Sequence, residues 1–262
     1  MKTEAVITHI VDWLKDYALN AKINGFVIGI SGGIDSAVTS TLCAETGLQL
    51  LCVEMPIHQH PSQVTLAQNH ITWLKENYPN VETLTTDLTT VFDQLVQVVP
   101  KVNKEQDRMM ALANTRARLR MTTLYYFAGL HNYLVAGTGN KIEDFGIGFY
   151  TKYGDGGVDI SPIADLSKTE VYALAKTMGI DQQIQKAAPT DGLWGDHRND
   201  EDQIGASYPE LEWAMEMSEN GKKATDFSGR ELEVFEIYTR LNKANQHKMT
   251  PIPVCEIPDN LR

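Results

Sequence analysis

Short apolar runs alternate with longer amphipathic segments along most of the chain. Four of these runs predict strands, at Gly25–Ile30, Leu48–Met55, Val81–Leu88 and Tyr133–Ala136. Helical spacing marks segments between them, at residues 35–45, 61–76 and 104–130. Strands that alternate with helices form parallel sheets, and nearly continuous apolar strands indicate burial on both faces. The pattern therefore predicts an α/β fold, with an open parallel sheet and helices on both of its faces.

Start and stop signals mark later helices. Ser167-Lys168-Thr169-Glu170 has the Ser-x-x-Glu form of a capping box, and Gly179 is expected to end the helix that it opens. Ser228-Gly229-Arg230-Glu231 predicts a second capping box. The polar segment Pro189–Gln203 is expected to be a loop. No Pro- or Gly-rich linker divides the chain, so we expect a single domain over residues 1–262.

Composition and charge narrow the class of protein. The chain has 262 residues, of which 42% are hydrophobic, so it can bury a sizeable core. Its net charge of −11 disfavours nucleic acid as a partner, since phosphate backbones attract basic surfaces. No apolar run is long enough to cross a membrane, and residues 1–17 have the pattern of an amphipathic helix rather than a signal peptide. Three scattered cysteines favour a location in the reducing cytoplasm.

The turn after the first predicted strand, GISGGIDSA at residues 29–37, suits an anion. Gly32 and Gly33 carry no Cβ, so a ligand can approach their backbone closely. The N–H groups at the start of the next helix attract negative charge, and Ser31 and Ser36 can donate further hydrogen bonds. In open α/β sheets, ligands bind at this end of the strands. The alternative is an ordinary tight turn.

Asp35 indicates what kind of anion site this is. A carboxylate beside a phosphate repels it unless a divalent cation lies between them, and Mg²⁺ takes one or two carboxylates together with phosphate oxygens. The turn also lacks the Gly-Lys-Ser/Thr ending of the ordinary mononucleotide loop. Glu143 follows the fourth predicted strand and can supply a second carboxylate for the same metal ion. The alternative is that Asp35 merely caps a helix.

Further polar side chains gather in two segments. NTRARLRM at residues 114–121 contains three arginines, which suit phosphate contacts or form a solvated helix face: Arg116, Arg118 and Arg120. The second segment, residues 137–170, begins where the fourth strand ends, so Gly137 and Thr138 share a sheet edge with the first turn. It also carries charged residues that belong either to a site or to ordinary turns and surface: Lys152, Asp155, Asp159 and Lys168.

Several of these motifs resemble known families. Residues 31–36 resemble the pyrophosphate-binding loop of the N-type ATP pyrophosphatases, which implies an adenine nucleotide alpha-hydrolase-like fold. Residues 137–170 closely resemble the NAD synthetases, as do residues 114–121 and QHKMTPIP at residues 246–253. The resemblance extends over roughly residues 24–253. It implies an ammonia-dependent ligase, in which ATP adenylates the nicotinate carboxylate of nicotinic acid adenine dinucleotide and ammonia then displaces AMP to give NAD.

The resemblance also implies roles for individual residues. ATP contacts are implied for Ser31, Gly32, Gly33, Asp35, Ser36, Arg118, Thr138, Lys168 and Thr190. Mg²⁺ is implied for Asp35 and Glu143. The deamido dinucleotide and ammonia are implied to meet Lys152, Asp155, Asp159, His247 and Lys248, of which the last two belong to a closing loop. Catalysis is expected from Asp35, Lys168 and Asp155, the last as acceptor of a proton from ammonium.

Some expectations concern the whole protein, and some alternatives stay open. The resemblance implies a homodimer. We expect direct use of free ammonia, unless a separate partner supplies it, because there is no room for a glutaminase domain before Ser31. Rival functions are tRNA thiolation, which the acidic charge disfavours, and a nucleotide-binding regulatory module without turnover. His58 and His60 are spaced like zinc ligands, without a third histidine or cysteine nearby. Three aromatic residues either stack on the nicotinate ring or belong to the core: Phe145, Phe149 and Tyr150.

Overall fold

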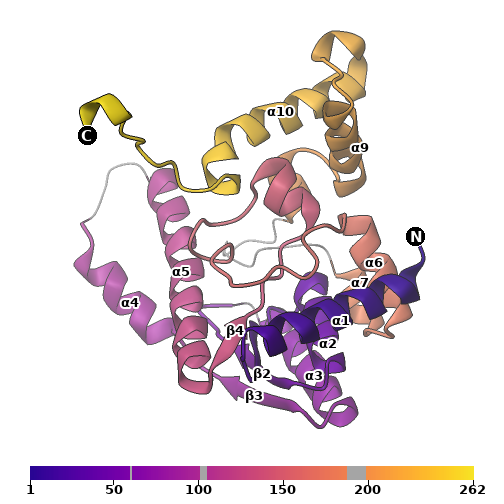
Figure 1. Cartoon of the computed structure of the whole chain (residues 1–262), viewed down its shortest axis with the longest axis vertical. Helices are drawn as coiled ribbons and strands as arrows, with labels where there is room; N and C mark the ends of the chain where they lie inside the picture. Colours follow the sequence, from indigo (N-terminus) through magenta and orange to yellow (C-terminus); the bar gives the residue numbers. More distant parts are fainter. Residues whose placement is uncertain (60, 101–104, 188–198) are drawn as a thin grey trace.

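The computed structural model describes residues 1–59, 61–100, 105–187 and 199–262. In this part of the chain, strands and helices alternate first, and helices dominate afterwards (Figure 1). The first part contains α1 (Thr3–Asn20), β1 (Gly25–Gly29), α2 (Ile34–Glu45), β2 (Gln49–Glu54), α3 (Pro61–Asn77), β3 (Val81–Thr85), α4 (Thr89–Val98), α5 (Glu105–His131) and β4 (Tyr133–Val135). The second part contains the π-helix η1 (Ile142–Ile147), α6 (Lys168–Thr177), α7 (Gln182–Lys186), α8 (Asp200–Ile204), α9 (Tyr208–Glu219), the 3₁₀ turn η2 (Ala224–Asp226), α10 (Gly229–Met249) and the 3₁₀ turn η3 (Asp259–Leu261).

Four strands of the described chain form one parallel sheet in the order β3-β2-β1-β4. Phe26 of β1 pairs with Leu50 of β2 on one side and with Leu134 of β4 on the other. The chain thus builds outwards from β1 to β3 and then returns to the opposite side of β1. In such sheets, ligands bind beyond the carboxyl ends of the strands, where the order of strands reverses. The loops after β1 and β4 lie at that point.

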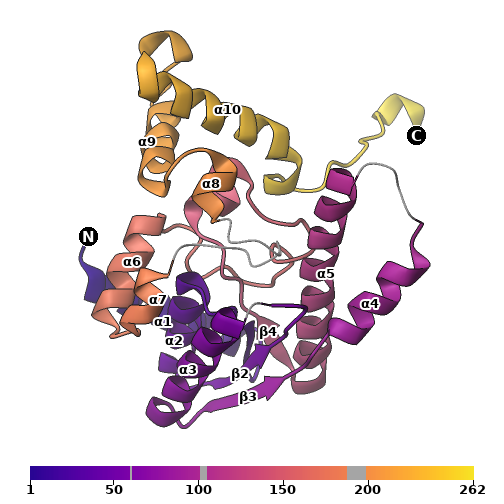
Figure 2. The ribbon, with the colours of Figure 1, turned by 180° about the vertical axis from the view of Figure 1, so that it is seen from behind.

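Helices cover both faces of the sheet, which confirms the predicted architecture (Figures 1 and 2). Successive side chains of a strand point to opposite faces. Phe26 therefore packs into the core under α1, α2 and α6, whereas Val27 packs into the core under α5. Both side chains are fully buried. Burial on two sides explains why the strands are apolar almost throughout.

A separate apolar cluster joins η1, α9 and α10. Its buried members include Ile142, Tyr208, Leu211 and Phe235. Both ribbon views place α9 and α10 beyond the carboxyl ends of the strands, with the long connection from β4 to α6 between them and the sheet (Figures 1 and 2). This helical layer therefore faces the end of the sheet where a ligand is expected.

The predicted cap of α6 is confirmed. A carboxylate oxygen of Glu170 accepts a hydrogen bond from the N–H of Ser167 (3.0 Å), and the Ser167 hydroxyl accepts one from the N–H of Glu170 (3.4 Å). Gly179 follows the helix with φ of +71°, the left-handed conformation in which glycine ends helices. The cap fixes the direction of the first residue of α6, which is Lys168.

The second predicted capping box is wrong. Ser228 precedes α10, but its side chain makes no capping hydrogen bond. Gly229 has φ of +57°, and Arg230 turns towards Glu210 of α9, with its Nε 2.7 Å from Oε1. The start of α10 therefore has no side-chain cap at Ser228, and Arg230 links it to α9.

The predicted loop Pro189–Gln203 is also wrong in its described part. Residues 188–198 lie outside the described ranges, and α8 begins directly after them. Oδ1 of Asn199 caps α8 by accepting a hydrogen bond from the N–H of Asp202 (2.7 Å). Such a short polar helix has no hydrophobic periodicity that a sequence pattern could detect. Three further helices, α4, α7 and α9, lie in segments for which the pattern predicts no element.

The cysteines behave as buried or exposed single residues. Cys43 and Cys52 are buried, Cys255 is exposed, and none of the three forms a disulfide. Burial raises the pKa of the Cys52 thiol to about 12, so the thiol is protonated at neutral pH and packs as a small apolar group. Of the helices in the described ranges, none has the length and apolar content needed to cross a bilayer.

Candidate active site

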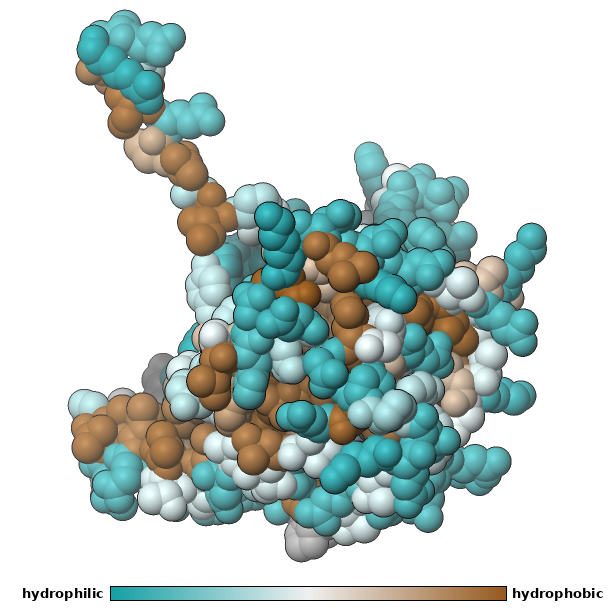
Figure 3. Space-filling view, turned by 60° about the horizontal axis from the view of Figure 1, so that its bottom comes forward, coloured by the Kyte–Doolittle hydropathy of each residue, from teal (hydrophilic) through white to brown (hydrophobic). Residues whose placement is uncertain are grey.

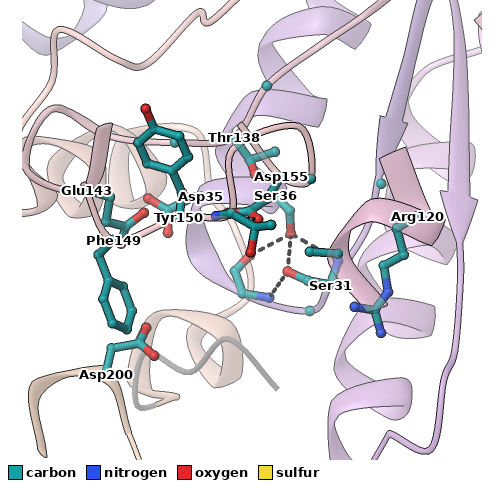
Figure 4. Close-up of a pocket in the computed structure, with 18 of the residues that line it drawn as sticks. Ser31, Asp35, Ser36, Arg120, Thr138, Glu143, Phe149, Tyr150, Asp155 and Asp200 are labelled. Atoms are coloured by element: carbon teal, nitrogen blue, oxygen red, sulfur yellow. Dashed lines mark hydrogen bonds between the residues drawn. The ribbon is translucent and has the colours of Figure 1, made fainter. Parts of the chain in front are cut away.

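A cavity of about 1090 Å³ lies at the carboxyl end of the sheet (Figure 4). One side is formed by the loop after β1, the end of β2 and the inner face of α5. The other side is formed by the loop after β4, η1 and the end of α10. The cavity thus occupies the place that the reversal in strand order predicts.

The loop after β1 is held in shape by its own serines. The Ser31 hydroxyl accepts a hydrogen bond from the N–H of Gly33 (3.2 Å), and the Ser36 hydroxyl donates one to the carbonyl of Gly33 (2.9 Å; Figure 4). Gly32 has φ of +86°, a conformation that suits glycine alone without strain. Gly33 precedes the first turn of α2, which borders the cavity. The loop therefore presents helix N–H groups to an anion.

Lys168 lies between two carboxylates. Its Nζ is 2.6 Å from Oδ2 of Asp35 and 3.1 Å from Oε1 of Glu143. Asn140 donates a hydrogen bond to the other oxygen of Asp35 (3.3 Å), and the Tyr208 hydroxyl donates one to Oε1 of Glu143 (2.5 Å). Asp35 comes from α2, Glu143 from η1 and Lys168 from α6, so three distant segments converge. The two carboxylates expected to share a metal ion lie side by side (Figure 4).

Negative charge exceeds positive charge around this cluster. Burial alone would lower the pKa of Lys168, but Asp35 and Glu143 outweigh burial and raise it above its ordinary value. Burial raises the pKa of Asp35 in spite of Lys168, and Glu143 adds to the rise. Burial and the neighbouring carboxylates raise the pKa of Asp144 to about 7. Because these acids are held above their ordinary pKa, the cavity favours an additional cation.

The donors present suit Mg²⁺. This ion binds proteins through one or two carboxylates and takes its remaining ligands from phosphate and water. Asp35 and Glu143 supply two oxygen donors beside an anion site. Among the residues that the structure describes, no group of three or more His, Cys, Asp or Glu side chains is arranged to hold a metal ion. The set therefore fits a metal that arrives with phosphate rather than a metal caged by protein alone.

Thr138 and Asp155 line the cavity from the segment after β4. An Asp155 oxygen accepts a hydrogen bond from the N–H of Thr151 (3.0 Å). Solvent reaches Asp155 through the cavity, yet the surrounding protein desolvates the carboxylate and raises its pKa to about 6. The group is therefore mostly ionised above pH 7 and can act as a proton acceptor there.

His247 and Lys248 lie in the last turn of α10 and not in the expected closing loop. Nζ of Lys248 donates hydrogen bonds to the carbonyls of Gly148 (2.8 Å) and Tyr150 (2.7 Å), and Lys248 lines the cavity. Lys152 lies outside the cavity lining, and its ammonium donates to the carbonyl of His247. These contacts fix the end of α10 against the segment that carries Asp155.

Of the other predicted residues, Arg118 and Asp159 do not line the cavity. Arg118 is exposed, and its Nε and Nη2 lie 3.4 Å from a backbone carbonyl of the connection between β4 and α6. The oxygens of Asp159 accept hydrogen bonds from the Tyr125 hydroxyl (3.0 Å) and from the N–H of Val135 (2.9 Å) at the end of β4. Thr190 lies outside the described residues. The ligand contacts expected for these three residues stay predictions.

Tyr208 and Asp144 were not singled out from the sequence, and Arg120 was named there only as one of three arginines without an assigned ligand contact. Arg120 lines the cavity, and its Nε donates to the carbonyl of Met55 (3.0 Å). Tyr208 covers Lys168, with its ring centroid 4.6 Å from Nζ. Asp144 lines the cavity next to Glu143. Sequence spacing places the arginines on different faces of α5, but it does not say which face points inwards.

The structure also answers questions that the sequence left open. Phe149 and Tyr150 line the cavity, Phe149 also packs against the apolar cluster of η1, α9 and α10, and Phe145 is 52% exposed. His58 lines the cavity with its Nε2 2.8 Å from Oδ1 of Asp93. His60 lies outside the described residues, and the described chain offers no set of zinc ligands around His58.

Comparisons with known proteins agree with this site. Residues 6–252 match the family described as NAD synthase. An NH(3)-dependent NAD(+) synthetase of Carboxydothermus hydrogenoformans is 35% identical, with 91% of this chain and 92% of the relative covered. The structure of NMN synthetase from Francisella tularensis is similar over 99% of both chains (30% identity, TM-score 0.82). The NH3-dependent NAD synthetase from Campylobacter jejuni is similar over 98% of this chain and 100% of its own (25% identity, TM-score 0.79). The chain therefore belongs to the NAD synthase family.

Proposed function

We propose that this chain is the ligase that amidates nicotinic acid adenine dinucleotide with ammonia, at the expense of ATP, to form NAD. The observation that carries this assignment is the convergence of Asp35, Glu143 and Lys168 beside the anion-binding start of α2. An ammonium and two metal-binding carboxylates at that point suit a nucleoside triphosphate that loses pyrophosphate. Thiolation of tRNA, the rival within the same loop superfamily, has no support in the family match.

In the first step, a carboxylate oxygen of the nicotinate ring attacks the α-phosphorus of ATP. The bond from that phosphorus to the bridging oxygen of pyrophosphate breaks, and an adenylate forms. The N–H groups of the loop after β1 and the ammonium of Lys168 bind the departing pyrophosphate. When ammonia attacks this adenylate, AMP is a good leaving group. Attack of ammonia on the free carboxylate would instead have to expel oxide.

Asp35 and Glu143 would hold Mg²⁺ in this scheme. When bound, Mg²⁺ supplies positive charge to the phosphate oxygens of ATP. Lys168 contacts both carboxylates, so we infer that it holds them at one point of the cavity. The hydrogen bonds from Asn140 and Tyr208 orient the same two carboxylates.

In the second step, ammonia attacks the carbonyl carbon of the adenylate, and the bond from that carbon to the oxygen of AMP breaks. Asp155 accepts the proton that ammonium must lose to become ammonia, and the surplus proton of the new C–N bond's nitrogen goes to solvent. Asp155→Asn should lower the turnover most strongly at low ammonia. Turnover that stays unchanged at every ammonia concentration excludes this role, and Asp165→Asn, at an exposed carboxylate, is the matched control.

The assay that tests the proposed function measures AMP in the presence of ATP, Mg²⁺, the deamido dinucleotide and ammonia. AMP release that requires both the dinucleotide and ammonia supports the ligase. Tight ATP binding without AMP release supports the regulatory module instead. Glutamine in place of ammonia should give no turnover, because we propose direct use of free ammonia.

A second candidate substrate is nicotinic acid mononucleotide, whose amidation gives NMN. The observation that favours it is the likeness to the NMN synthetase from Francisella tularensis, with a TM-score of 0.82 over 99% of both chains. The reacting carboxylate is the same in both substrates, so Asp35, Glu143 and Lys168 serve either. The ratio of kcat/KM for the mononucleotide and the dinucleotide in the AMP assay decides between them.

We also infer that two copies of the chain associate. Exposed apolar side chains on α4 and α5 support this: Val91 (52% exposed), Val98 (78%), Tyr126 (64%) and Leu130 (62%). Figure 3 shows apolar surface gathered on the side of the molecule where Figure 1 places α4. Contiguous apolar surface of this kind marks protein interfaces.

A further inference from the structure

Glu54, the last residue of β2, is a buried carboxylate that the proposed mechanism does not use. Its side chain is 5% exposed and lines the cavity. Oε2 accepts a hydrogen bond from the Thr85 hydroxyl (3.0 Å). Oε1 is buried and receives no hydrogen bond from the described residues. A buried oxygen without a donor is destabilising, so a ligand in the cavity is a natural source of the missing donor.

The position of Glu54 indicates which group of a nucleotide it meets. β2 lies beside β1, and Val53 pairs with Gly29 at the start of the phosphate-binding loop. In dinucleotide-binding α/β folds, whose turn has the sequence G-x-G-x-x-G rather than the one found here, a carboxylate about 20 residues after that turn accepts a hydrogen bond from a ribose hydroxyl. Glu54 has this place relative to Gly32 and Gly33.

The surrounding walls fit a nucleoside. Apolar side chains line this part of the cavity, including Met55, Ala67 and Leu124, whereas Lys168 lies with the carboxylates of α2 and η1. We infer that Oε1 of Glu54 accepts a hydrogen bond from a ribose hydroxyl of ATP and so selects a ribonucleotide as the co-substrate. The inference rests on the proposed use of ATP and adds a specificity residue to it.

A purely structural role is the alternative. A smaller cavity of about 350 Å³ adjoins Glu54, between β3 and α3, and is lined by Gln68 and Thr72. In that case Glu54 only links β2 to Thr85 of β3. Its replacement then weakens the fold but does not change how the protein ranks ribose analogues.

The test compares ATP with 2′-deoxy-ATP and 3′-deoxy-ATP, in the wild-type protein and in Glu54→Met. Calorimetric dissociation constants and kcat/KM for AMP release are both measured. We expect the wild type to favour ATP over one of the two analogues by about 10- to 100-fold, the range of a hydrogen bond to a charged group. Glu54→Met should reduce that preference to about 3-fold or less, as expected when one partner of a coupled pair is removed.

Two outcomes overturn the inference independently. One is equal binding of ATP and both deoxy analogues by the wild type, a result that does not depend on how the variant folds. The other is an unchanged preference in Glu54→Met. Purine riboside triphosphate, which lacks the 6-amino group, should bind more weakly than ATP by the same factor in the wild type and in Glu54→Met. If its affinity is reduced relative to ATP only in the wild type, Glu54 contacts the base, and its assignment to the ribose is overturned.

Glu45→Met is the matched control. Glu45 also accepts a hydrogen bond from a hydroxyl, that of Tyr78 (3.4 Å), but lies outside the cavity lining. Its replacement should leave the preference between ATP and its deoxy analogues unchanged. If the wild type binds ATP without releasing AMP, the proposed function fails, while the dissociation constants still test the role of Glu54.

Discussion

The charges around Lys168 decide what the cavity can bind. One ammonium contacts Asp35 and Glu143, and two further acids with raised pKa values, Asp144 and Asp155, line the same cavity. A triphosphate placed beside this many carboxylates is repelled unless a cation accompanies it. The two carboxylates are therefore suited to meet ATP as metal ligands rather than by direct contact.

Lys168→Met tests this charge balance. Removal of the ammonium leaves Asp35 and Glu143 buried without their cation, so we expect the free energy of unfolding to fall by roughly 3 kcal/mol. AMP release should fall by about 100-fold or more, because the departing pyrophosphate loses a fixed positive charge. Denaturant unfolding and the AMP assay measure the two effects.

Lys141→Met is the control for this prediction. Nζ of Lys141 lies 3.7 Å from Oδ1 of Asp165 in an exposed ion pair, and such pairs contribute little to stability. Its replacement should change neither quantity appreciably. Wild-type turnover in Lys168→Met would contradict the role that we assign to this ammonium.

At the scale of elements, the capping box of α6 fixes the position of Lys168, which contacts both Asp35 and Glu143. Ser167→Ala removes the hydroxyl that accepts the N–H of Glu170, which should cost about 1 kcal/mol of stability. Ser228→Ala at the start of α10 is the matched control, because that serine makes no capping bond, and its effect should stay within about 0.5 kcal/mol. Urea unfolding of both variants measures the difference, and equal losses would contradict the structure.

The contact between α2 and α3 contains a buried histidine. Nε2 of His70 lies 2.9 Å from the Ser40 hydroxyl, and the ring stacks on Trp73 with centroids 5.7 Å apart. Burial lowers the pKa of His70 to about 4, although the Ala37 backbone and Asp181 oppose the shift. The imidazole is therefore neutral in the folded protein at every pH at which the enzyme is expected to work.

This histidine gives stability a defined dependence on pH. The unfolded chain binds a proton at His70 near pH 6.5, and the folded protein binds it only near pH 4. The contribution of His70 should therefore be fully present above about pH 7 and be lost as the pH falls from 6.5 towards 4, by about 3 kcal/mol in total. In urea unfolding, the difference in free energy of unfolding between the wild type and His70→Gln should decrease by that amount as the pH falls. A difference that does not change with pH would refute the prediction.

At the scale of the whole molecule, the exposed apolar side chains of α4 and α5 predict association of two copies. Tyr126→Asp places a charge on this surface and should convert a dimer to single chains, since an unpaired charge is costly in an interface. Leu19→Asp, at an exposed apolar position of α1, is the control and should leave the mass unchanged. Analytical ultracentrifugation gives both masses. A wild-type protein that sediments as one chain would refute the dimer.

The sequence by itself determined the elements that carry the site. The predicted strands β1, β2 and β4 agree with the structure to within one residue at each end, because apolar runs and glycine turns are local signals. It also determined that Asp35 and Glu143 share one edge of the sheet. Each follows a parallel strand, and the carboxyl ends of parallel strands lie together. The capping box before Lys168 is a local signal of the same kind.

Only the tertiary structure decided which side chains face the cavity. The packing of α5 on the sheet turns Arg120 inwards and leaves Arg118 exposed, although both arginines occur in one helical segment. The cap expected at Ser228 is not formed, Arg230 contacts α9 instead, and the pairing of β2 with β3 brings Thr85 to Glu54. These outcomes depend on contacts between residues far apart in the chain, which the local hydrophobic pattern does not encode.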